Sequence, residues 1–151
     1  GPEVLTYAEM IRRFAAVTGR RQPLVVTVPV LTPRLASHWV GLVSAQIARI
    51  TRRMHEAGFV HNDLKWRNVL VTLGDAPTVY LIDCPSGGNW WGPFLQYRIV
   101  KDLACLDKVG KYQLTRTQRL RFYLDYARKA RLDAADKARI RRILRFFEGR
   151  E

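Results

Sequence analysis

Cysteine is scarce in this 151-residue chain, which contains Cys84 and Cys105 and no CxxC pair. The three histidines, His38, His55 and His61, do not have the spacing of a helical metal-binding pair. A disulfide framework and a zinc site are therefore poor interpretations, and we expect two reduced thiols that pack in the core.

Long apolar runs are also lacking, since no uninterrupted run approaches the roughly 18–20 residues that a bilayer span requires. The first residues, Gly1-Pro2-Glu3, do not have the basic-then-apolar order of a secretory signal. Because 48% of the residues are hydrophobic, intrinsic disorder is excluded. We expect a soluble cytoplasmic protein without a transmembrane segment, with the inner face of the membrane as an alternative location.

Acidic residues are few: 13 Asp+Glu stand against 26 Lys+Arg, which gives a formal net charge of +13. Residues 111–151 alone hold 13 basic and 5 acidic side chains. Such a surface attracts polyanions, including nucleic acid, anionic membrane surfaces and phosphorylated or acidic glycans. The favoured alternative is the solvated face of amphipathic helices, because several arginines interleave with apolar residues at helical spacing: Arg119, Arg121, Arg128, Arg139, Arg141, Arg142 and Arg145.

The pattern along the first part of the chain is mainly helical. Apolar periodicity and end signals predict a helix over residues 7–18, and a β-branched run predicts a strand over 24–30. A longer apolar stripe predicts a helix over about 33–57, with a potential break near Gly41 and with Gly58 placed to end it.

Residues 59–83 contain two short apolar runs joined by a turn-rich segment, which predicts a β-hairpin. Polar residues precede the first strand, and Asp83 closes the second. The hairpin would therefore bring Asp63, Asn68 and Asp83 to one end. Phosphoryl transfer needs such a group, because one carboxylate orients an attacking hydroxyl while a second carboxylate and an amide oxygen hold Mg²⁺.

A family resemblance follows from these residues. The segment His61-Asn62-Asp63-Leu64-Lys65-Trp66-Arg67-Asn68 resembles the protein-kinase catalytic loop H-R-D-L-x-x-x-N, and Leu81-Ile82-Asp83 resembles the strand that ends in the metal-binding aspartate. Together with the segment from Lys101 to Lys108, residues 45–151 most resemble the bacterial lipopolysaccharide kinase (Kdo/WaaP) family.

The resemblance implies a role for each matching residue and implies ATP and Mg²⁺ as cofactors. Asp63 corresponds to the catalytic base, and Lys65 would steady the transferred phosphoryl group. Asn68 and Asp83 correspond to the Mg²⁺ ligands.

Two further residues would support the loop: His61 is implied to be structural, and Asp102 to brace the catalytic loop from a helix. The sequence also departs from the protein-kinase pattern. Asn62 replaces the usual arginine, and Cys84-Pro85 follows Asp83 where Phe-Gly is typical. An activation-segment switch is therefore not expected.

Trp90 and Trp91 follow in a glycine-rich stretch. A substrate platform is one interpretation of this pair. Packing against the long segment after Asp83 is the favoured one.

The first 44 residues do not fit a kinase lobe, because the chain has no G-x-G-x-x-G and no lysine before Lys65. Residues 1–10 and 28–35 instead resemble the C-terminal part of atypical extended short-chain dehydrogenases. None of the nucleotide-binding half is included, so no NAD(P) binding is expected. The chain is therefore interpreted as a chimera, natural or engineered, joined near Ser44-Ala45.

The predicted fold is a mainly helical α+β domain with a kinase-like C-terminal lobe, five or more helices and three short strands. Residues 1–44 would not be an independent domain but would form one compact unit with residues 45–151. Their apolar side chains would pack on the rest of the chain or on a second copy in a homo-oligomer: Met10, Ile11, Phe14, Leu35 and Val40.

The first functional hypothesis is an incomplete kinase-like lobe for a sugar or lipopolysaccharide hydroxyl. Its activity is expected to be very weak or nil, since the nucleotide clamp is missing. The second hypothesis is a non-enzymatic chimeric fold. The third is a basic polyanion-binding module, which rests on charge alone.

Overall fold

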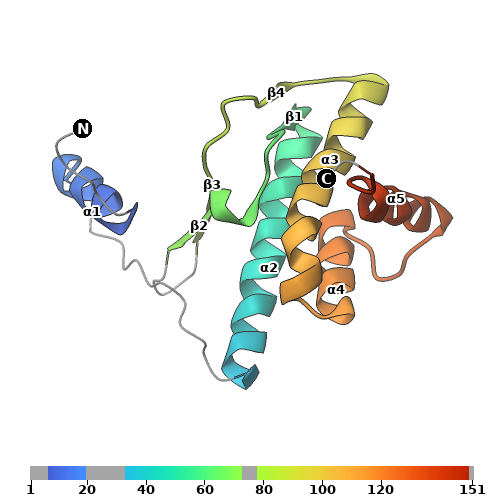
Figure 1. Ribbon diagram of the computed structural model, residues 1–151, viewed down its shortest axis with the longest axis horizontal. Helices are drawn as coiled ribbons and strands as arrows, with labels where there is room; N and C mark the ends of the chain where they lie inside the picture. The colour runs from blue at the N-terminus through green and yellow to red at the C-terminus, as the bar shows by residue number, and fades with distance from the viewer. Residues whose placement is uncertain (1–6, 20–32, 73–77, 150–151) are drawn as a thin grey trace.

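The computed structural model describes residues 7–19, 33–72 and 78–149 (Figure 1). The described chain is mainly helical, with a short 3₁₀ turn and four short strands, and this confirms the predicted α+β class. In chain order the elements are α1 (Tyr7–Val17), α2 (Pro33–Glu56), β1 (Phe59–Val60), η1 (Trp66–Asn68), β2 (Val69–Thr72), β3 (Thr78–Leu81), β4 (Gly88–Asn89), α3 (Gly92–Gln113), α4 (Arg116–Ala127) and α5 (Ala134–Arg145).

Helix α2 is the longest element and leads directly to the candidate site. It runs through Gly41 without interruption, so the predicted potential break there is wrong. Gly58 ends the helix with a φ of +77°, a conformation that glycine adopts without strain. Its carbonyl accepts a hydrogen bond of 2.8 Å from the Trp90 amide, which ties the end of α2 to the segment after β4.

Two small antiparallel sheets flank the loop of residues 61–68. In the first, β2 pairs with β3, with Val69 opposite Leu81 and Thr72 opposite Thr78, as the hairpin prediction required. In the second, β1 pairs with β4, and this pairing was not predicted. The strand predicted over 24–30 lies outside the described residues.

The helices form a body in which α2 packs on α4, while α3 contacts both α4 and α5 (Figure 1). A cluster of buried apolar side chains joins the hairpin to this body. It consists of Ile47 of α2, Leu64, Val79 of β3 and Leu106 of α3. The hairpin and the loop before it are therefore held against two long helices by buried apolar side chains.

Helix α1 does not bury its apolar face in a single molecule. Met10 is 47% exposed and Phe14 is 64% exposed in the single chain, and their packing on the rest of the chain or on a second copy stays a prediction. The side chains of Ile11, Leu35 and Val40 lie outside the described set. Figure 1 shows α1 apart from the helical body, and contact of its apolar face with a second copy stays a prediction.

Both cysteines are free thiols. Cys105 is buried, as expected, and burial raises the pKa of its thiol to about 11. Cys84 is only half-buried, so the expected full burial is wrong for this residue.

Candidate active site

His61 begins the loop between β1 and η1 and is 1% exposed. Its backbone amide donates to Asp102 Oδ2 at 2.8 Å. Its Nε2 lies 3.0 Å from the carbonyl oxygen of Ile82. Because a carbonyl can only accept, Nε2 carries the ring proton and donates it. His61 thus joins the loop both to helix α3 and to the end of β3.

Asp102 lies at the centre of a buried network beneath the loop. It is fully buried, and its Oδ2 also lies 3.3 Å from His55 Nε2. The other ring nitrogen of His55 lies 2.8 Å from the hydroxyl of Tyr126. A neutral imidazole satisfies both bonds by donating from Nε2 and accepting at Nδ1. The network therefore connects α2, α3 and α4 to the backbone of His61.

Asn62 occupies a left-handed conformation, with a φ of +65° that asparagine adopts more readily than most residues. Its Nδ2 donates to the carbonyl of Ser86 at 2.6 Å. Its Oδ1 accepts from Arg98 Nη1 at 2.8 Å, and the Arg98 guanidinium stacks 3.6 Å from the centre of the Trp90 ring. Asn62 is therefore held on both sides by the segment that follows β3.

Asp63 carries a partly exposed carboxylate in the loop. Lys65 Nζ lies 2.6 Å from its Oδ1, and Arg67 Nη2 lies 3.9 Å from its Oδ2. The hydrogen bond from Lys65 lowers the pKa of the Asp63 carboxyl below its usual value and outweighs the partial desolvation that raises it. Asp63 is therefore ionised at neutral pH.

Asn68 joins the loop to the hairpin. It is 2% exposed, and its Nδ2 donates to the carbonyl of Asp63 at 2.8 Å. The backbone carbonyl of Asn68 accepts a hydrogen bond from the Ile82 backbone amide at 2.9 Å. Asp83, the next residue after Ile82, is exposed and has a φ of +57°.

The donor set at this end of the hairpin fits a hard divalent cation in its chemistry. Among the described residues, the Asp83 carboxylate has no hydrogen bond or ion pair, and the Asn68 amide donates through Nδ2, so its oxygen is available. Carboxylate and amide oxygens are the ligands that Mg²⁺ takes in proteins. In the described parts of the chain, no group of three or more His, Cys, Asp or Glu side chains could hold a metal ion.

Sequence reasoning singled out the residues that the structure connects at the loop. Asp63 contacts Lys65 and Asn68, and His61 contacts Asp102. Their roles in phosphoryl transfer stay predictions.

Three contributors were missed because each reaches the loop through a long-range contact. No spacing pattern marks them. They are His55, Arg98 and Tyr126.

The expected packing of the two tryptophans holds for only one of them. Trp90 is half-buried beneath the Arg98 guanidinium. Trp91 is 78% exposed, so the packing expected for it is wrong.

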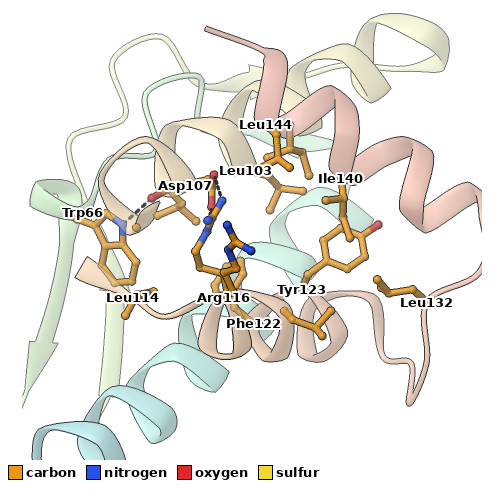
Figure 2. A pocket seen from close by; sticks show the side chains of 15 residues that line it. Trp66, Leu103, Asp107, Leu114, Arg116, Phe122, Tyr123, Leu132, Ile140 and Leu144 are labelled. Atoms are coloured by element: carbon orange, nitrogen blue, oxygen red, sulfur yellow. Dashed lines mark hydrogen bonds and ion pairs between the residues drawn. The ribbon is translucent and has the colours of Figure 1, made fainter. Parts of the chain in front are cut away.

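A separate pocket of about 480 Å³ lies between α3, α4 and α5 (Figure 2). Its lining is mainly apolar and includes Leu103, Phe122 and Ile140. At its edge, Arg119 donates twice to Asp107, both at 2.7 Å. The indole of Trp66 contributes to the wall and donates to the Leu106 carbonyl at 2.7 Å.

Comparison with known proteins finds a family model and solved structures that are similar to this chain. A model of the lipopolysaccharide kinase (Kdo/WaaP) family matches residues 39–126. Among solved structures, the chain is similar to WaaP in complex with acyl carrier protein, with 26% sequence identity and a TM-score of 0.59. This similarity covers 79% of the present chain and 52% of the other, so the chain spans about half the length of the WaaP chain. No curated protein sequence matches.

Proposed function

Because the chain belongs to the lipopolysaccharide kinase (Kdo/WaaP) family, we propose that it carries the catalytic loop of an ATP-dependent kinase. The acceptor is a hydroxyl group of a sugar in a phosphorylated or otherwise acidic lipid-linked glycan. Such an acceptor places the reaction at the inner face of the membrane. The observation that carries the proposal is the partly exposed, ionised Asp63 carboxylate held 2.6 Å from Lys65.

In this mechanism Asp63 orients the acceptor hydroxyl and takes its proton as the oxygen attacks the γ-phosphorus of ATP. The bond from that phosphorus to the bridging oxygen breaks, and ADP leaves. A lowered pKa makes Asp63 a weak base, so its main contribution is orientation. Lys65 lies beside the carboxylate and offsets negative charge on the transferred phosphoryl group.

Asn68 and Asp83 would hold Mg²⁺, which supplies charge neutralisation of the nucleotide phosphates. His61 supports this part of the site, since it bonds the carbonyl of the residue before Asp83. The loop is therefore hydrogen-bonded to the end of β3.

The 151-residue chain by itself is expected to transfer phosphate very slowly or not at all. It contains no glycine-rich phosphate loop and no lysine before Lys65, so the γ-phosphate would not be positioned. The dehydrogenase-like origin of residues 1–44 and the chimeric join near Ser44-Ala45 stay predictions. The family match begins at residue 39, before that join.

Thermal unfolding with and without Mg²⁺ tests the metal ligands. In the parent we expect millimolar Mg²⁺ to raise the melting temperature by about 2 °C, which corresponds to less than about 1 kcal/mol for a chain of this size. Asp83→Asn should abolish this rise, whereas the control Glu148→Gln, at an exposed carboxylate beyond the C-terminal end of α5, should retain it. ATP should add little.

Absence of any metal effect in the parent would contradict the catalytic-site proposal and leave a non-enzymatic fold. A large additional effect of ATP would contradict the expected absence of a nucleotide clamp.

We also propose an acyl carrier protein as a partner, as in the solved WaaP complex. The supporting feature is the pocket between α3, α4 and α5, which has the size and apolar lining of a small-molecule site. Leu144 and Leu120 line it while remaining 50% and 42% exposed, so an acyl chain could enter between them.

Binding of an acylated carrier protein should weaken about tenfold in Leu144→Glu, because a carboxylate at the entrance opposes entry of an apolar chain. Val109→Glu is the matched control, since Val109 is 44% exposed on α3 and does not line the pocket. Equilibrium titration followed by fluorescence anisotropy measures both. Equal effects of the two variants would contradict the pocket as the binding site.

A further inference from the structure

An aromatic ridge stands on the surface at the start of α3. It consists of Trp91 at the N-cap, where the backbone is extended, and of Phe94 and Tyr97, which are three residues apart in α3 and so are neighbours on the helix surface. Their exposed fractions are 78%, 67% and 53%. Large aromatic side chains gathered on one exposed face indicate an interaction surface rather than ordinary scatter.

Helix α5 continues this surface. The rings of Tyr97 and Phe146 have centroids 5.5 Å apart, and Arg139 Nη2 donates to Gln96 Oε1 at 3.4 Å. Arg142 lies one turn from Arg139 and one turn from Phe146, so it belongs to the same stripe of α5. Arginines therefore border the aromatic ridge.

No exposed carboxylate interrupts this surface within the two helical segments. In residues 92–106 the acidic residue is Asp102, which is fully buried. In residues 134–145 it is Asp136, which is 4% exposed and lies 2.8 Å from Lys129 Nζ. The exposed acids that flank α5 are Asp133 at its N-cap and Glu148 beyond its last turn. The face is therefore both aromatic and cationic.

This surface is distinct from the pocket, yet it connects to the catalytic loop. The pocket takes Ile140, Ile143 and Leu144 from α5, whereas the surface takes residues 139, 142 and 146. Arg98, one residue after Tyr97, bonds Asn62 of the loop. A partner seated on the ridge would therefore lie close to the residues that hold the loop.

We propose that the ridge and its bordering arginines bind the surface of an anionic membrane. Tryptophan and tyrosine prefer the boundary between headgroups and acyl chains, and arginines are attracted to anionic headgroups. In the described parts of the chain, no helix is long and apolar enough to cross a bilayer. The inference deepens the proposed function by placing a lipid-linked acceptor near the loop, but vesicle binding requires no phosphoryl transfer.

Sedimentation with lipid vesicles tests the surface in the full chain. We expect binding to phosphatidylcholine vesicles that contain phosphatidylglycerol and little binding to phosphatidylcholine alone. The double variant Trp91→Ser/Phe94→Ser should weaken binding about tenfold, because two apolar anchors are lost. Serine suits the N-cap position that Trp91 occupies, so the helix should persist. Arg142→Gln should weaken binding by several-fold.

Tyr112→Ser is the matched control, since Tyr112 is 76% exposed on the opposite end of α3. Its vesicle binding should equal that of the parent. Heparin binding should be unchanged in Trp91→Ser/Phe94→Ser, because a soluble polyanion does not use apolar anchors. If thermal unfolding shows that the double variant is not folded, Trp91→Ser alone provides the measurement.

The proposal would be overturned by an absence of binding to the anionic vesicles, or by equal losses in the ridge variant and in Tyr112→Ser. It would also be overturned if the ridge variant abolished self-association in sedimentation velocity while vesicle binding was absent. That result would assign the surface to a second copy of the chain. None of these outcomes depends on ATP, Mg²⁺ or Asp63, so failure here is distinguishable from failure of the kinase proposal.

Discussion

Replacing Asp102 by alanine is expected to lower the free energy of unfolding by about 3 kcal/mol or more. Asp102 Oδ2 accepts from the His61 amide and from His55 Nε2, and all three residues are buried. The substitution leaves two buried donors without an acceptor, and each unsatisfied group costs about 1–3 kcal/mol. Urea denaturation followed by circular dichroism measures the change.

Two further variants separate the buried acceptor from a general effect of removing charge. Asp102→Asn keeps one acceptor oxygen, so it should cost less than Asp102→Ala. Asp107→Ala, five residues further along α3, removes a carboxylate that is 21% exposed and pairs with Arg119. That change should cost about 1 kcal/mol. Equal losses in Asp102→Ala and Asp107→Ala would show that the buried network beneath the loop contributes no more to the free energy of unfolding than the partly exposed ion pair does.

The hairpin and the loop that precedes it were predictable because their signals are local. Two short apolar runs predicted β2 and β3, and the turn-rich segment between them predicted the antiparallel connection. The order of His61, Asp63, Asn68 and Asp83 in the motif then placed polar residues at one end of the hairpin. Gly58 was predictable for a similar reason, since glycine ends helices in the left-handed conformation observed here.

The buried network was not predictable because its members come from distant positions. His55 and Tyr126 are 71 residues apart, and His55 and Asp102 are 47 apart. A single sequence carries no pattern that pairs such residues. Tyr126 in particular follows ordinary helical periodicity, and nothing marks its hydroxyl as a hydrogen-bond partner.

Asn62 illustrates a mismatch that the structure explains. The protein-kinase pattern has arginine at this position of the motif, so asparagine counted as a departure. In the fold, a guanidinium still reaches this position, because Arg98 extends from α3 to Asn62 Oδ1. The loop is therefore anchored from a different element, which the spacing of the motif could not indicate.

The pairing of β1 with β4 was not predicted, because each strand is only two residues long. Strands this short have no apolar period to detect, and Gly88 is a poor strand former. Their pairing is set by Gly58 and Trp90, whose backbone bond closes the same segment. Tertiary geometry rather than local preference determines this part of the fold.

Replacing Leu64 by alanine is the second substitution with a large expected effect. Leu64 lies between Asp63 and Lys65 in the motif and is fully buried against Ile47 and Leu106. Truncating a fully buried leucine creates a cavity and costs about 2–5 kcal/mol. We expect a loss in this range by urea denaturation, together with loss of the Mg²⁺-dependent rise in melting temperature, because the apolar anchor of the catalytic loop is removed.

Leu120→Ala is the matched control for this cavity, since the same side chain is removed from a position on α4 that is 42% exposed. Its cost should stay below about 1 kcal/mol, because much of that side chain already contacts water. A loss of less than about 1 kcal/mol in Leu64→Ala, or equal losses in the two variants, would mean that the loop is not anchored through its leucine. A loss of about 2–5 kcal/mol with the Mg²⁺-dependent rise intact would instead mean that the backbone bonds of His61 and Asn68 suffice to hold the loop in place.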